Sequence, residues 1–105
     1  MVLVAQFEDA DAIAQADEIL SVPGIRMAIV GRGDLAHSMG LTGKLSDPKV
    51  IAEVEKVIAA CKRKKVAPGL LCNDTEEAKD WIARGARFIT YSNEISLLQE
   101  EYEKA

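Results

Sequence analysis

The chain has 105 residues, a formal net charge of −4 and an apolar content of 49%. This length suits a single domain, and the mixture of apolar residues with both charge signs is typical of a folded chain. The sequence has no basic stripe for nucleic acid, no apolar run near the roughly 20 residues of a membrane span, and no metal-binding cysteine spacing. We therefore expect one cytoplasmic domain over residues 1–105, without nucleic-acid or membrane partners.

The first third of the chain predicts a strand, a helix and a second strand. Residues 2–7 have the β-branched content and the length of a strand. Residues 9–20 place apolar side chains on one helical face, and the pair at 23–24, Pro-Gly, ends that helix. Residues 26–30 have a second strand pattern, and we interpret residues 31–33, Gly-Arg-Gly, as the turn that follows it.

The rest of the chain repeats this alternation. Asp47 and Pro48 suit the N-cap and the first position of a long helix, and the cations at 62–65 suit its negative C-terminal end. The remaining predicted elements are a strand at 66–71 that starts or bulges at Pro68-Gly69, a helix at 74–84 with a capping box, a strand at 87–91, and a final helix capped by Asn93.

This alternation of strands and helices predicts an α/β fold with a parallel sheet and right-handed crossovers. Four βα units amount to half of a (βα)₈ barrel, which typically takes about 250 residues. They could equally form a small open doubly wound sheet, and periodicity alone does not decide between these two architectures.

Two carboxylates occupy equivalent places in the first two predicted units. Glu8 and Asp34 each follow a predicted strand, and the carboxyl ends of parallel strands meet at the edge where α/β folds bind ligands. Two hard oxygen ligands suit Mg²⁺ or Mn²⁺ better than Zn²⁺. The alternative is that both residues only cap the helices that follow them.

Several motifs in the chain resemble the HpcH/HpaI aldolase/citrate lyase family, whose members include class II pyruvate aldolases. The resemblance covers nearly the whole chain and places it on the C-terminal half of the family's barrel. Its motifs are Gln6-Phe7-Glu8, Asp17-Glu18-Ile19 with Val22-Pro23-Gly24, Gly31-Arg32-Gly33-Asp34-Leu35 with Ser38-Met39-Gly40, and Ala67-Pro68-Gly69.

The resemblance implies a metal-dependent lyase site that acts on small 2-keto acids such as pyruvate through an enolate. It implies that Glu8 and Asp34 hold the divalent metal, with Mg²⁺ or Mn²⁺ expected and Co²⁺ as a further option. It also implies that the backbone N–H groups of Gly33 and Asp34 bind the substrate carboxylate, with Gln6 as a nearby polar group.

The chain also departs from the family pattern. The family's turn commonly reads Gly-Pro-x-Asp-Leu-Ser, whereas Arg32 and Ala36 stand here at the proline and serine positions. The family takes its pyruvate-binding Arg and catalytic His from the other half of the barrel, so we name no catalytic residue in this chain. We interpret His37 as a surface loop residue and Cys72 as a buried small hydrophobe.

Two functional hypotheses therefore stay open at the level of sequence. One is a lyase domain, and the other is a catalytically incomplete half-barrel or interaction module that retains the fold. In either case the first and last predicted strands would leave unpaired apolar edges. We therefore expect a homo-oligomer, or pairing with a missing N-terminal half-barrel.

Overall fold

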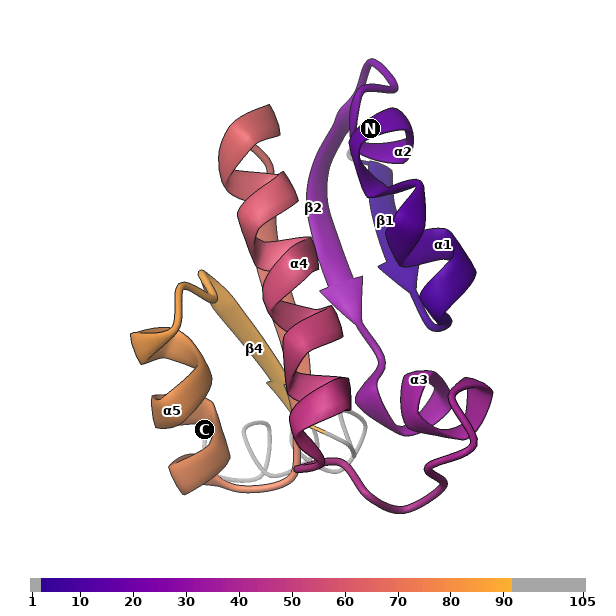
Figure 1. Ribbon diagram of the computed structural model, residues 1–105. Helices are drawn as coiled ribbons and strands as arrows, with labels where there is room; N and C mark the ends of the chain where they lie inside the picture. The colour runs from indigo at the N-terminus through magenta and orange to yellow at the C-terminus, as the bar shows by residue number, and fades with distance from the viewer. Residues whose placement is uncertain (1–2, 92–105) are drawn as a thin grey trace, which may run out of the picture.

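A computed structural model describes residues 3–91 of the chain, and within them four strands alternate with five helices (Figure 1). The elements are β1 Leu3–Phe7, α1 Ala10–Ala14, α2 Ala16–Leu20, β2 Ile25–Val30, α3 Arg32–Ser38, α4 Pro48–Lys64, β3 Ala67–Cys72, α5 Thr75–Ala83 and β4 Phe88–Tyr91. The predicted helix that Asn93 caps lies outside the described residues, as does the predicted strand's first residue, Val2.

The strands form one parallel sheet in the order β1-β2-β3-β4. Within the described residues, β1 and β4 are therefore the two edges of the sheet, as the sequence predicted. All strands run the same way, so their carboxyl ends share one edge and their amino ends share the opposite edge (Figure 1). The alternation of strands and helices and the parallel sheet are both confirmed.

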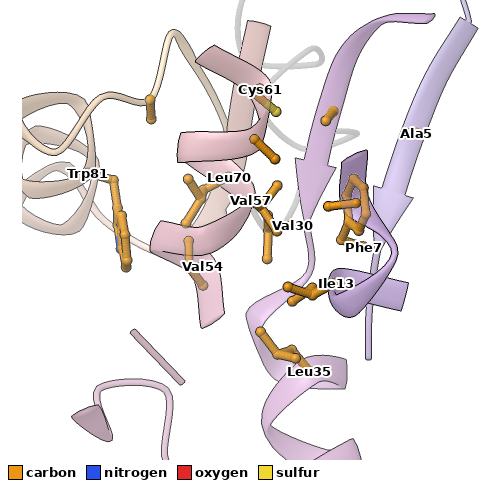
Figure 2. Packing of buried hydrophobic residues seen from close by; sticks show 14 of the residues in the cluster. Ala5, Phe7, Ile13, Val30, Leu35, Val54, Val57, Cys61, Leu70 and Trp81 are labelled. Carbon is orange, nitrogen blue, oxygen red and sulfur yellow. The ribbon is translucent and has the colours of Figure 1, made fainter. Parts of the chain in front are cut away.

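The two faces of the sheet differ in how they are covered. Side chains that alternate along the strands toward the helices are buried and form the core, which Figure 2 shows packed between the sheet and α4. On the other face, Val4 and Leu71 remain 43% and 37% exposed. The buried strand residues on the helical side are Ala5, Phe7, Ala28, Val30, Leu70 and Cys72.

On the open face, an aromatic ring lies directly against a glycine. Gly69 of β3 pairs with Phe88 of β4, and a Cβ atom at Gly69 would clash with the Phe88 ring. Pro68 is the second residue of β3 and pairs in regular register with Ala28, so the strand start predicted there is confirmed. The one shift in register among the paired strands lies instead between Leu3 and Val4.

Helix α4 has the ends that its sequence predicts. The Asp47 side chain accepts a hydrogen bond from Lys49 N at 2.9 Å, and Pro48 occupies the first turn. Three cations fill the last turn, and Lys65 ends the helix in the left-handed conformation with φ 58°. Within residues 3–91 no helix is long and apolar enough to cross a membrane.

Two sequence predictions about local structure are wrong. The segment 9–20 forms two short helices, because Gln15 N bonds to Ala12 O and Gln15 leaves the helical range at φ −105° and ψ 17°. This break still allows Ile13 and Leu20 to be buried. Residues 31–33 are also not a separate turn, since Gly31 is the N-cap of α3 and the helix begins at residue 32.

Candidate metal and substrate site

Glu8 and Asp34 converge on a single glycine at the carboxyl edge of the sheet. Gly31 N donates a hydrogen bond to Phe7 O at 3.0 Å, which fixes the end of β2 beside the end of β1. A Cβ atom placed on Gly31 would lie 3.6 Å from Glu8 Cγ and 4.0 Å from Asp34 Oδ2. The missing side chain at Gly31 therefore leaves a small open cradle between the two carboxylates.

Neither carboxylate serves as the helix cap that the alternative interpretation requires. Asp9, not Glu8, caps α1, because its Oδ1 accepts a hydrogen bond from Ala12 N at 2.7 Å. Gly31 caps α3, and Asp34 lies inside the first turn of that helix. Both Glu8 and Asp34 are exposed, and no described Lys, Arg or His forms an ion pair with either.

The donor set suits a hard divalent cation. The Glu8 side chain and the Asp34 carboxylate lie beside the cradle, and among residues 3–91 no cluster of three or more His, Cys, Asp or Glu side chains exists to complete a cage. Mg²⁺ commonly uses one or two carboxylates and takes its other ligands from water and substrate. The absence of thiolate or imidazole from the pair disfavours a structural Zn²⁺ site of the usual kind.

The other two predicted site residues lie at the same edge. Gln6 is exposed on the open face of β1, two residues before Glu8 and opposite Ile29 of β2. Gly33 faces open space, with nothing within 4 Å of the position that a Cβ would take. Gly33 and Asp34 lie in the first turn of α3, where backbone N–H groups have no partner inside the helix.

Arg32 is a buried residue whose role the sequence analysis missed. Its side chain is 4% exposed, and Nη2 contacts Leu71 O at 3.2 Å and the carboxylate of Glu77 at 3.2 Å. The guanidinium also lies 5.9 Å from the centre of the Trp81 ring, while its buried Nε has no partner among the described residues. The cation thus turns away from the cradle and links α3 to β3 and α5.

Glu77 extends this link to the loop between β3 and α5. Its Oε2 accepts a hydrogen bond from Asn73 N at 2.8 Å, and its own N–H donates to Asp74 Oδ1 at 2.8 Å. Asp74 thus accepts the hydrogen bond that the predicted capping box requires, whereas Glu77 reaches back to the N–H of Asn73, one residue before the N-cap. The Glu77 carboxylate also pairs with Arg32, so α3 and α5 are joined at the carboxyl edge through one ion pair.

His37 is a surface residue and Cys72 is a buried one, as the sequence predicted. His37 is exposed, and its Nδ1 contacts Thr42 Oγ1 at 2.9 Å, although it lies in α3 and not in a loop. Cys72 is fully buried, and this burial raises the pKa of its thiol while the charge of Arg32 opposes the rise. Neither side chain completes a cluster with Glu8 and Asp34.

Comparison with known proteins identifies the family. The family model of the HpcH/HpaI aldolase/citrate lyase family matches residues 1–100. The chain belongs to this family. A 4-hydroxy-2-oxo-heptane-1,7-dioate aldolase of Escherichia coli is 31% identical over 98 residues, which are 93% of this chain and 37% of that protein.

Two further proteins of known family or activity are similar to this chain. A hydroxypyruvate/pyruvate aldolase of Sagittula stellata is 34% identical over 97 residues, covering 92% of this chain and 38% of its own length. The crystal structure of an HpcH/HpaI aldolase/citrate lyase family protein from Burkholderia cenocepacia superposes with a TM-score of 0.85 at 28% identity, covering 99% of this chain and 41% of that one. The chain thus spans less than half the length of these relatives, and its four parallel βα units resemble the C-terminal half of a (βα)₈ barrel, as predicted.

Proposed function

We propose that the chain supplies the metal-binding half of a class II aldolase site, with Glu8 and Asp34 as ligands of Mg²⁺ or Mn²⁺. The observation that carries this proposal is that Gly31 lies against both residues, with Glu8 Cγ 3.6 Å and Asp34 Oδ2 4.0 Å from the position that a Cβ would take. Co²⁺ binds a given oxygen or nitrogen site more tightly than Mn²⁺ in the usual order of affinities and stays a candidate. When bound, such an ion acts as a Lewis acid toward the oxygen on which negative charge develops.

We propose a small 2-keto acid such as pyruvate as the substrate, which the ion would hold beside the first turn of α3. The backbone N–H groups of Gly33 and Asp34 would bind the substrate carboxylate, because N–H groups of a first helical turn lack internal acceptors. The open space at Gly33 leaves room for that approach. Gln6 would add a side-chain amide from the open face of β1.

The chain alone would leave this site incomplete, so we propose that an N-terminal half-barrel covers the open face. That face carries apolar side chains, among them Val4 and Leu71, and both sheet edges are unpaired within residues 3–91. The relatives are more than twice as long as the matched region, and the rest of their length is the segment to which such a partner would correspond. A second copy of the chain is the alternative occupant, and molecular mass in solution distinguishes the two.

The direct test is release of pyruvate from a 4-hydroxy-2-oxo acid, with Mn²⁺ or Mg²⁺ added. We expect activity to need the ion and to fall at least about 100-fold in Glu8→Gln and in Asp34→Asn, since even loss of a group that only supports a ligand costs 10–100-fold. Glu18→Gln is the matched control, because Glu18 is an exposed carboxylate of α2 away from the cradle.

Two outcomes would change the assignment. Equal activity in Glu8→Gln, Asp34→Asn and the parent chain would remove these residues from the site. Metal binding that depends on both carboxylates, without any turnover even in the presence of an added N-terminal half-barrel, would instead favour a catalytically incomplete module.

A further inference from the structure

A groove lies at the amino edge of the sheet, at the opposite end of the strands from Glu8 and Asp34. Its volume is about 730 Å³, within the range of roughly 300–1,000 Å³ that is usual for small-molecule sites. The ends of α4 and α5 and the starts of β2, β3 and β4 surround it. Its lining residues are Arg26, Ile58, Cys61, Lys62, Lys65, Val66, Ala67, Pro68, Arg84, Gly85 and Arg87.

The groove is strongly cationic although the chain as a whole is acidic. Five of its lining residues are Lys or Arg, and none is Asp or Glu. Arg84 is paired with Glu55 and Asp80. The other four, Arg26, Lys62, Lys65 and Arg87, form no ion pair with any acidic residue among those described. Their charges are therefore available to an anionic ligand.

Two of these cations reach the groove from the starts of strands. Arg26 is exposed and lines the groove at the start of β2, where the register between β1 and β2 shifts. Arg87 N donates to Pro68 O at 2.8 Å, which fixes this residue beside the start of β3. Both arginines therefore lie at the strand starts, facing the end of α4.

The dipole of α4 accounts for only some of the cations that line the groove. Lys62 and Lys65 at the C-terminal end of α4 do complement its negative pole. The dipole does not account for Arg26, which lies in β2, or for Arg87, which directly precedes β4. Lys65 also has φ 58°, a left-handed conformation that glycine or asparagine adopts at lower cost. A lysine at this position has a higher conformational free energy than glycine or asparagine would have, and it adds a further cation to the lining of the groove.

We propose that this groove binds a small phosphorylated molecule, with its phosphate groups among Arg26, Lys65 and Arg87. Arginine binds phosphate through paired N–H donors, and several uncompensated cations suit a ligand with two or more negative charges. Apolar atoms of Ile58 and Val66 provide a wall for the organic part of the ligand. The site is separate from the 2-keto acid site and does not depend on the function proposed there.

The test is a titration of the full chain with pyrophosphate and with adenosine diphosphate, at constant ionic strength, followed by calorimetry and by amide chemical shifts. We expect saturable binding of one ligand per chain, with the largest shifts at Arg26, Lys65 and Arg87. Arg26→Gln and Arg87→Gln should each weaken binding at least about tenfold. Tighter binding of adenosine diphosphate than of pyrophosphate would assign the apolar wall to an organic group, whereas equal binding would assign the groove to phosphate alone.

Lys79→Gln is the matched control, because it removes one exposed positive charge from α5 outside the groove. Lys65→Gly keeps the left-handed position at lower cost, so it should fold at least as well and still weaken binding at least about tenfold. Binding that never saturates, or that Lys79→Gln weakens as much as Arg26→Gln does, would overturn the proposal. Binding of an oligonucleotide without binding of pyrophosphate would overturn it as well.

Discussion

The two edges of the sheet differ in charge and in how that charge is arranged. At the carboxyl edge, two exposed acidic residues, Glu8 and Asp34, lie beside Gly31, while the nearby cation Arg32 is buried and paired with Glu77. At the amino edge the relation is reversed, because several cations line an open groove with no acidic residue in its lining. Each edge therefore leaves one sign of charge uncompensated, and each suits a ligand of the opposite sign.

One residue connects the two edges. The Trp81 ring is buried in α5, with the Arg32 guanidinium 5.9 Å and the Arg84 guanidinium 5.4 Å from its centre. Arg32 is part of the carboxyl edge and Arg84 is part of the amino edge. The two arginines contact the same ring but differ in burial, so we expect them to differ in how much each contributes to stability.

The largest expected effect is loss of stability in Arg32→Met. This change leaves the Glu77 carboxylate, 27% exposed, without its cation, and we expect about 2–3 kcal/mol of destabilisation in urea unfolding. Arg84→Met is the matched control, because Arg84 contacts the same ring but is 38% exposed with exposed partners. Equal losses of unfolding free energy in Arg32→Met and Arg84→Met would contradict the expected difference between the buried and the exposed arginine.

We expect the two cysteines to differ in how their thiols affect stability at alkaline pH. Burial raises the pKa of the Cys61 thiol from 9.0 to about 11, so the folded state holds its proton longer than the unfolded chain does. Stability from this source is complete below pH 9 and is lost as the pH rises toward 11, by up to about 2–3 kcal/mol. We expect Cys61→Ala to flatten the alkaline decline in urea unfolding more than Cys72→Ala, because Arg32 opposes the shift at Cys72.

A decline in Cys61→Ala as steep as in the parent chain would assign the alkaline loss to other groups.

The smallest expected effect comes from a substitution at Gly31, the residue that forms the cradle. Gly31 has φ −92°, so alanine fits its backbone, and the added Cβ would only reach van der Waals contact with Glu8 and Asp34. We expect Gly31→Ala to fold normally and to weaken Mn²⁺ binding about tenfold, because the methyl group occupies the space between the ligands. Calorimetry with Mn²⁺ measures this loss, and pyrophosphate binding at the other edge should not change.

Much of the fold could be predicted from the sequence. Asp47 with Pro48, and Asp74 with Glu77, are local signals whose hydrogen bonds form within a few residues, so both helix starts are where the sequence placed them. The parallel sheet followed from the alternation of elements. The break at Gln15 was not predictable in this way, because both halves of the segment retain the same apolar periodicity.

The candidate site was predicted in part. Topology and family resemblance placed Glu8 and Asp34 on one edge, but the part of Gly31 in bringing them together depends on the register of β1 and β2. Arg32 was noted only as a departure from the family's turn, because its partners Leu71 and Glu77 lie about forty residues further along the chain. The cationic groove likewise gathers residues from separate elements, and no contiguous pattern encodes it.

Paramagnetic broadening by Mn²⁺ in the amide spectrum of the full chain tests the central claim most directly. The two central strands, β2 and β3, have six residues each and so span about 20 Å, which separates the two edges well. We predict that the signals of Glu8, Gly31 and Asp34 broaden at the lowest Mn²⁺ concentrations, that Lys65 at the amino edge stays sharp, and that Glu8→Gln with Asp34→Asn abolishes the effect. Broadening that begins elsewhere, or that survives in this double variant, would contradict the assignment of the metal site.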